Sequence, residues 1–235
     1  AWAGSQKYAV LTWSGDISST FRAMREQLQA GLSMGMAGIP WWTSDIGGFL
    51  GGQVDDPAFR ELLVRWFQWA CFCPVFRMHG ERSPWYEREQ EYIGDVRQLT
   101  SGQANEVWSF GDEVYEILRK YLFVRERMRP YIREVMRAAH EHGDPVMRPL
   151  FYGFPADKAA WSVEDEYLLG ADVLVAPVLE AGARVRDVYL PAGADWMDAA
   201  TGAEYAGGQT VRMDAPLETM PVLIRKGSGV RVYKS

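Results

Sequence analysis

Cysteine is scarce in this sequence of 235 residues, which contains only Cys71 and Cys73, in a Cys-x-Cys within an apolar run. Two cysteines at this spacing cannot build a disulfide framework. No group of histidines and cysteines has the spacing of a zinc site. We therefore expect two buried free thiols, no bound metal and no cofactor.

Long apolar runs are missing as well. No run approaches the roughly 18 residues that span a bilayer, so we expect no membrane partner. The net charge of −6 argues against nucleic acid as a partner. The chain begins at Ala1 in material typical of the middle of a domain, so we expect its true N-terminus to be missing. The sequence therefore leaves the compartment open between cytoplasmic and periplasmic or secreted, and a homo-oligomer is compatible with it.

The first 150 residues alternate short apolar runs with helical patterns. The runs cover residues 8–13, 39–42 and 72–76, and each ends in polar residues before a glycine-containing loop. We predict a strand for each run, and the repeated strand–loop–helix order is typical of parallel β/α architecture. In a (β/α)8 barrel the active site lies at these strand ends. Three such units cannot close a barrel, so we expect only part of one.

Helix ends are marked by capping residues. Ser18 or Ser19 can cap the helix after the first run, and Asp56 the helix after the second. Residues 112–142 are predicted to form one long helix that ends at Gly143. Before it, the polar loop 80–111 is long enough to cover a site.

The pattern changes after residue 150, where short β-type runs alternate with turn residues. This alternation predicts a small antiparallel β-sandwich. We expect a partial barrel over residues 1–150, the sandwich over 151–228, and a linker or the start of a missing domain over 229–235. The runs of the sandwich are residues 173–178, 185–190, 210–213 and 222–224.

Three ionisable side chains follow the three predicted strands of the barrel part. They are Asp16, Asp45 and His79, and the aromatic residues Trp13 and Phe49 lie near them in the sequence. A carboxylic acid can protonate a leaving glycosidic oxygen, and flat rings stack on sugars, so the set suits carbohydrate chemistry. In the alternative, the two aspartates cap the following helices and the histidine is a core residue.

The motifs around these residues resemble those of glycoside hydrolase family 31. Residues 13–19 (WSGDISS) resemble the family's acid/base motif, 42–49 (WTSDIGGF) its next strand end, and 77–80 (RMHG) its Arg-x-His strand end. Residues 147–149 (MRP) and 169–178 (LGADVLVAPV) resemble the passage into the family's proximal C-terminal sandwich. The resemblance implies an α/β fold, the C-terminal half of a (β/α)8 TIM barrel followed by a small antiparallel β-sandwich.

The resemblance also implies roles for individual residues. Asp16 would be the general acid/base of a retaining exo-α-glycosidase, which acts on an oligosaccharide or α-glycoside. His79 would hydrogen-bond sugar hydroxyls, and Trp13 and Phe49 would form the walls of that subsite.

Asp45 and Arg77 would form an ion pair that supports this subsite. Direct binding of a sugar hydroxyl by Asp45 and a plain helix-capping role stay open as alternatives. Glu81 and Arg82 follow the histidine motif closely, together with Trp85. For these three residues, contact with substrate and packing of the loop are equally compatible with the sequence.

One departure from the family concerns the nucleophile. The family carries it in a Trp-x-Asp-Met-Asn-Glu-type motif, and these 235 residues contain none. Retaining hydrolysis needs two carboxyl groups about 5–5.5 Å apart. We therefore predict that the parent protein is an enzyme and that the isolated chain is inactive.

Two substrate classes fit the resemblance, α-glucosides and α-xylosides with the bond at the non-reducing end. Residues 42–49 and 77–80 resemble the bacterial α-xylosidase-like members most. A transglycosylase of the same family is the near alternative. A non-catalytic carbohydrate-binding module, built from the sandwich alone, is the alternative from another class.

Overall fold

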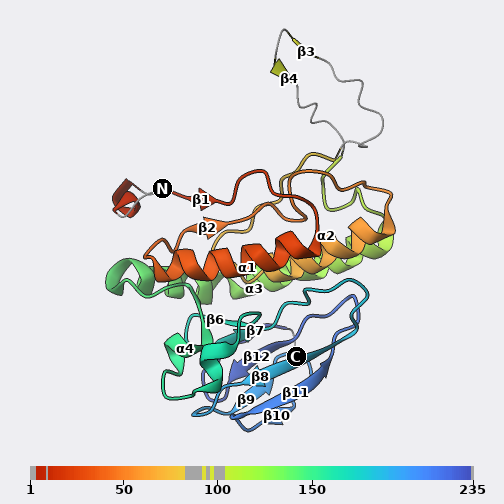
Figure 1. The fold of residues 1–235 in the computed structure, drawn as a ribbon. Helices are drawn as coiled ribbons and strands as arrows, with labels where there is room; N and C mark the ends of the chain where they lie inside the picture. The colour runs from red at the N-terminus through yellow and green to blue at the C-terminus, as the bar shows by residue number, and fades with distance from the viewer. Residues whose placement is uncertain (1–3, 9, 83–91, 94–95, 98–103, 234–235) are drawn as a thin grey trace.

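The computed structural model describes residues 4–8, 10–82, 92–93, 96–97 and 104–233. Its elements form three layers (Figure 1). A pair of short strands lies on one side of the helices, and a β domain lies on the other side. The strands are β1 (Thr12–Trp13) and β2 (Trp42–Thr43), and the helices are α1 (Phe21–Met36), α2 (Pro57–Ala70) and α3 (Asp112–His142).

The strand pair is parallel, as the barrel prediction requires. Trp13 is paired with Thr43, one residue after the pair Thr12–Trp42. The strand predicted for the first run is shorter than the run, and the one predicted for the third run is absent. Tyr8, where the first run begins, is the last residue of a 3-10 helix, η1 (Ser5–Tyr8), and among the run's described residues only Thr12 and Trp13 form a strand.

The third run, 72–76, forms no strand within the described residues. The polypeptide there still lies beside β2, because the hydroxyl of Thr43 donates to the carbonyl of Val75 at 3.0 Å. A strand needs a ladder of backbone bonds. This side-chain bond does not supply one, and the described residues 72–76 take part in no strand pairing.

The helix ends follow the predicted chemistry with one correction. Asp56 caps α2 by accepting a hydrogen bond from the backbone N–H of Ala58. Thr20, rather than Ser18 or Ser19, caps α1. The third helix is continuous from residue 112 to 142, and it ends at Gly143 in a left-handed conformation (φ 78°) that glycine adopts without a steric cost.

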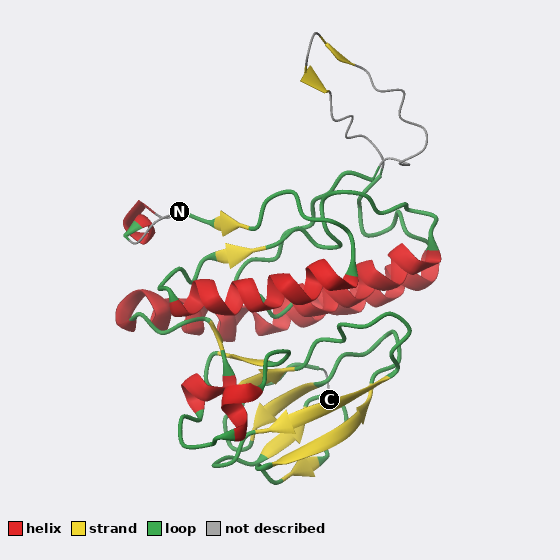
Figure 2. Ribbon diagram, viewed as in Figure 1, coloured by secondary structure: helices red, strands yellow, loops and turns green. Residues whose placement is uncertain are grey.

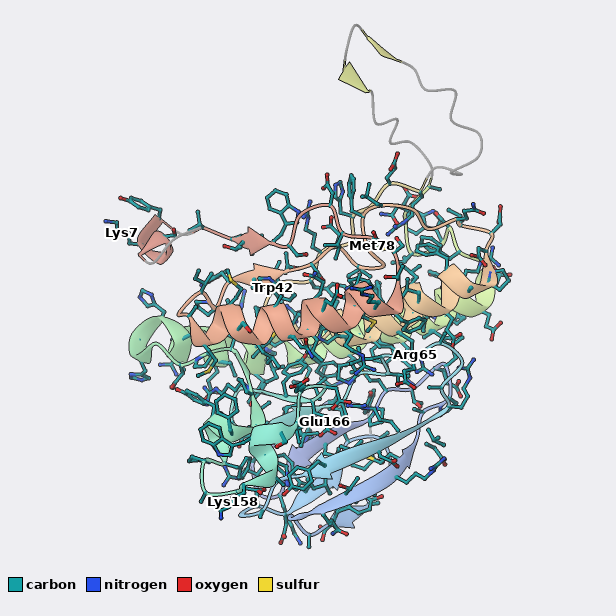
Figure 3. The ribbon with its side chains drawn as sticks, viewed as in Figure 1. Lys7, Trp42, Arg65, Met78, Lys158 and Glu166 are labelled. Atoms are coloured by element: carbon teal, nitrogen blue, oxygen red, sulfur yellow. The ribbon has the colours of Figure 1, made fainter. Side chains whose placement is uncertain are left out.

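The strand pair packs tightly on α1. Trp42 is almost fully buried, and Figure 3 places it between β2 and α1. A Cβ atom at Gly31 would lie 2.7 Å from the Trp42 ring, so only glycine leaves room for the indole at this position of the helix. This contact sets the distance between β2 and α1, and therefore also the position of the loop that follows β2.

The C-terminal part contains the predicted antiparallel β-sheets (Figure 2). A six-stranded sheet has the order β10-β9-β12-β7-β6-β5, and β8 pairs with β11. Two short helical segments, α4 (Leu150–Gly153) and η2 (Ala159–Ser162), lie beside the sheets. Outside the C-terminal part, and before α3 in the sequence, β3 (Tyr92–Ile93) and β4 (Val96–Arg97) form a separate antiparallel pair. The strands of the domain are β5 (Met147–Arg148), β6 (Tyr167–Leu169), β7 (Val173–Val175), β8 (Val185–Leu190), β9 (Trp196–Asp198), β10 (Glu204–Tyr205), β11 (Gln209–Asp214) and β12 (Val222–Arg225).

A buried cation joins the helices to the β domain. Arg65 of α2 has no exposed surface, and Figure 3 shows it between the two layers. Its guanidinium donates to the carbonyls of Ala215 and Thr219, each at 2.7 Å, and to that of Ala183 at 3.0 Å. Burial lowers the pKa of Arg65 to about 10, so the side chain stays charged at neutral pH. A buried charge is tolerated only when it is well hydrogen-bonded. These contacts therefore hold α2 in one position against the β domain.

Candidate active site

The three loops predicted to carry the chemistry meet at the carboxyl ends of β1 and β2. The backbone N–H of Phe49 donates to the carbonyl of Ile17 at 2.8 Å, which joins the second loop to the first. The N–H of Ile46 donates to the carbonyl of Arg77 at 3.2 Å, and that of Glu81 to the carbonyl of Phe49 at 2.8 Å. The segment after residue 76 is thereby joined to the same loop, so the second loop lies between the other two.

Asp16 lies in the first loop, where its side chain is exposed. Gly15 before it has a positive φ of 77°, and the N–H of Ile17 turns back to donate to the carbonyl of Gly15 at 3.0 Å. Asp16 is therefore the central residue of a tight turn ahead of the helix that follows. Because Thr20 caps that helix, the capping alternative does not apply to Asp16.

Asp45 is fully buried and forms an ion pair with Arg77, whose Nη1 atom lies 2.7 Å from Asp45 Oδ1. Apart from this ion pair, neither carboxylate oxygen has a hydrogen-bond partner within the described part of the chain. Burial raises the pKa of Asp45, and the neighbouring Asp16 adds to this, while Arg77 and His79 oppose it. No described helix begins beside Asp45, and its oxygens are shielded from solvent, so its position suits the supporting role better than direct contact with a sugar.

Two aromatic contacts complete the arrangement. The guanidinium carbon of Arg77 lies 5.6 Å from the centre of the Trp13 ring, a cation–π distance. Trp13 is half exposed, so one part of the indole contacts the cation while another faces solvent. The rings of Phe49 and His79 lie 5.3 Å apart and are tilted by 37°. His79 is exposed and Phe49 half-buried, so both can contact a molecule in the solvent.

Five of the six residues selected from the sequence are at least partly exposed, and the sixth, Asp45, is buried among them. Asp16, Trp13 and His79 present exposed groups, while Asp45 lies beneath and holds Arg77. In such a set, an exposed carboxylate can exchange a proton with a bound sugar derivative, and the aromatic rings and the imidazole can hold that sugar by stacking and hydrogen bonds.

Arg82 has a larger part in this arrangement than the sequence suggested. It is completely buried, and Glu81 is 1% exposed, so loop packing rather than substrate contact describes both. Trp85, the third residue of that prediction, lies outside the described residues. The signal that could have identified Arg82 is an arginine two residues after an active-site motif, but its burial depends on contacts with distant segments.

No metal centre competes with this site among the residues that the structure describes. No cluster of three or more histidine, cysteine, aspartate or glutamate side chains there could hold a metal ion. In the same residues, no helix is long and apolar enough to cross a membrane.

Comparisons with known proteins identify both parts of the chain. Residues 1–135 match the description "Glycosyl hydrolases family 31 TIM-barrel domain", and residues 143–230 match "Glycosyl hydrolase family 31 C-terminal domain". Together with the parallel strand pair and the antiparallel sheets, these matches confirm the predicted fold class.

Individual relatives are similar over nearly the whole chain. An α-xylosidase of Saccharolobus solfataricus is 33% identical over 97% of this chain and 28% of its own length. The α-glucosidase 2 of Bacillus thermoamyloliquefaciens is 35% identical over 97% of this chain and 26% of its own length. A crystal structure of an α-xylosidase from a soil metagenome, complexed with xylose, has a TM-score of 0.92 and 58% identity over 98% of this chain and 34% of that one. The chain thus spans well under half of the length of these relatives.

Proposed function

The chain belongs to glycosyl hydrolase family 31, and we propose that the full-length protein carrying it is a retaining exo-α-glycosidase with Asp16 as its general acid/base. The observation that carries this proposal is the exposed Asp16 carboxylate on a loop joined by a backbone hydrogen bond to the loop of Phe49. From this position Asp16 protonates the leaving glycosidic oxygen. It then accepts a proton from the water that releases the sugar.

The neighbouring side chains bind the sugar that is cleaved off. We propose that His79 hydrogen-bonds its hydroxyls and that Trp13 and Phe49 form the walls of the subsite. Arg77 contacts Trp13, and Asp45 holds Arg77, so this pair keeps the indole in place. The arrangement gives each of the five residues a contact that suits its chemistry.

The second carboxylate of the retaining mechanism lies outside these residues in this proposal. The two groups must stand about 5–5.5 Å apart, with the nucleophile free to attack the sugar. Asp45 does not meet this requirement, because both of its oxygens are shielded and one lies in the ion pair. The isolated chain of 235 residues is therefore expected to be inactive, and any turnover that Asp16→Ala abolishes in it contradicts this.

Among substrates, we favour an α-xyloside over an α-glucoside. The support is the 58% identity to an α-xylosidase whose structure was solved with xylose, against 35% to an α-glucosidase. The match of residues 1–135 to a catalytic barrel domain also makes a purely sugar-binding module a poorer description than an enzyme.

The test compares aryl α-xyloside and aryl α-glucoside hydrolysis by the full-length protein. We expect a higher kcat/KM for the xyloside, and the first product seen by NMR to keep the α configuration. Asp16→Asn should lower kcat/KM about 10²–10⁴-fold on a substrate with a poor leaving group. The loss should be smaller with an activated aryl leaving group, which needs little protonation.

Asp55→Asn is the matched control, because Asp55 is a fully exposed carboxylate in a neighbouring loop. This control should leave kcat/KM unchanged. Full activity of Asp16→Asn on the poor leaving group contradicts the proposed role. Inversion of the anomeric configuration contradicts the proposed reaction.

A further inference from the structure

One buried cation touches the loops that carry the proposed sugar-binding residues. Arg82 donates from Nη1 to the carbonyl of Gly48 at 2.8 Å and from Nη2 to that of Ile46 at 2.9 Å. Nη2 also reaches the carbonyl of His79 at 3.4 Å. Nε donates to Oδ1 of Asn105 at 2.8 Å, which adds a contact from the far end of the long loop. A single side chain thus joins three segments that are distant in the sequence.

The surroundings of Arg82 leave little freedom for the guanidinium. Its carbon lies 4.9 Å from the centre of the Phe59 ring. A Cβ atom at Gly80 would lie only 2.5 Å from that carbon, and one at Gly47 would lie 3.2 Å from Nη2. Because both neighbours are glycines, the planar group fits between the two loops. A lysine ammonium, which is a point charge on a flexible stem, cannot make the same set of bonds.

The charge of Arg82 strengthens these contacts. Burial lowers its pKa to about 10, and Asp45 raises it, so the side chain is a cation at neutral pH. Its carbonyl partners are therefore in charge-assisted hydrogen bonds, which are stronger than neutral ones. Loss of these bonds leaves buried carbonyl groups unpaired, and the two loops are then joined only by the backbone bonds from Ile46 and Glu81 described above.

We infer that Arg82 is a positioning residue for the sugar-binding subsite, acting through His79 and Phe49. It bonds to the carbonyl of His79 itself and to that of Gly48, the residue before Phe49. With no exposed surface, it cannot touch the sugar. The inference rests on the proposed function, because it concerns where the imidazole and the phenyl ring stand relative to a bound glycoside.

The experiment measures kcat and KM of the full-length protein with Arg82→Lys. A misplacement of about 1 Å can cost about 10²-fold in rate, so we expect kcat/KM to fall about 10- to 100-fold. A double-mutant cycle with His79→Ala separates positioning from general damage. If Arg82 acts through His79, the loss in the double variant falls at least about fivefold short of the product of the single losses.

The chain provides a matched control in Arg65, an equally buried arginine bonded to carbonyls away from the site. Arg65→Lys should lower the Tm, as Arg82→Lys does, while kcat/KM stays within about twofold of the unchanged protein. The fold-loss of kcat/KM in the double variant of Arg65→Lys and His79→Ala should equal the product of the two single losses. Equal loss of activity in both lysine variants, or independent effects of Arg82 and His79, overturns the inference.

Asn105→Ala keeps the inference testable if Arg82→Lys does not fold. It removes only the partner of Arg82 Nε, so we expect a smaller loss of kcat/KM. Combined with His79→Ala, the loss should again be less than the product of the two single losses. Independent effects in this cycle also overturn the inference. An unchanged protein that hydrolyses no α-glycoside is a different outcome, because it contradicts the proposed function itself.

Discussion

Arg77 and Asp45 form an ion pair at 2.7 Å in which the side chain of the acid is fully buried and that of the base is 33% exposed. The two partners therefore depend on each other unequally. Without Asp45, water can still solvate the guanidinium. Without Arg77, the carboxylate is buried beside Asp16, and only His79 and Arg82 remain to oppose the rise of its pKa.

The first prediction uses this difference. Arg77→Met should destabilise the full-length protein by about 3–5 kcal/mol at neutral pH, because it leaves a buried charge without its partner. Burial already raises the folded-state pKa of Asp45, and the loss of Arg77 raises it further. The contribution of such an acid is fully present below its unfolded pKa and lost as pH rises through the folded pKa. The Tm deficit should therefore shrink as pH falls.

Asp45→Asn in the same background is the control for this prediction. Asparagine does not titrate, so the Tm of the double variant should show no such pH-dependent deficit. The prediction is contradicted if Arg77→Met alone loses the same stability at acid and at neutral pH.

The second prediction concerns the contact between the first two loops. Gly48 and Gly51 both have a positive φ, of 77° and 82°. An alanine in this conformation costs about 1–2 kcal/mol at either position. At Gly48 its Cβ would also lie 2.7 Å from the carbonyl oxygen of Ser18 and from Cα of Ser19, while at Gly51 nothing lies within 4 Å. Backbone cannot move aside cheaply, so Gly48→Ala should cost about 1–3 kcal/mol more than Gly51→Ala.

Chemical denaturation of the two glycine variants measures this difference. The clash also pushes on the loop of Asp16, so kcat/KM should fall in Gly48→Ala and change little in Gly51→Ala. Equal stabilities of the two variants would show that the loops are not in contact as described.

Features encoded by a few adjacent residues could be predicted from the sequence. Asp56 caps its helix and Gly143 ends the long one, because capping depends on the neighbouring backbone groups alone. The prediction of Ser18 or Ser19 as a cap was wrong by one or two positions. Hydroxyl residues stand at 18, 19 and 20, and in the structure Ser18 and Ser19 pair with Leu50 while Thr20 caps the helix.

Features that depend on distant segments could not be predicted. The residues 72–76 are apolar enough for a strand, but whether a backbone ladder forms depends on the neighbouring segment. The burial of Arg82 follows from Gly47, Gly80 and Asn105, which come together only in the folded chain. The motifs therefore selected the candidate site residues, while the contacts that hold them required the structure.

The third prediction is that both thiols are unreactive in the folded protein. Cys71 and Cys73 are free and buried. Burial raises the pKa of Cys71 to about 12 and that of Cys73 further, in spite of the nearby Arg125. Because the thiolate is the reactive form, a disulfide reagent should modify neither residue at neutral pH and both in denaturant. Rapid labelling of the native protein, with Cys71→Ser and Cys73→Ser to assign it, would contradict the described burial.

The fourth prediction concerns a carboxylate in the β domain. Glu166, which is labelled in Figure 3, is almost fully buried and accepts a hydrogen bond from the N–H of Tyr189 at 3.0 Å. Burial raises its pKa to about 8, although Arg186 lies 3.6 Å away and opposes this. The stability that protonated Glu166 provides is fully present below its unfolded pKa and is lost as pH rises through about 8.

Glu166→Gln removes this titration with little change in shape. The amide oxygen can still accept from Tyr189, and Arg186 keeps its ion pair with Asp165 at 3.1 Å. Relative to the unchanged protein, the variant should gain stability as pH rises from about 5 to about 9, by up to about 4 kcal/mol. Glu164→Gln is the control at an exposed glutamate two residues away, and it should not reproduce the gain of stability expected for Glu166→Gln. A Glu166→Gln difference that stays constant with pH would mean that Glu166 is ionised in the folded protein at all these pH values, and that Arg186 outweighs the effect of burial.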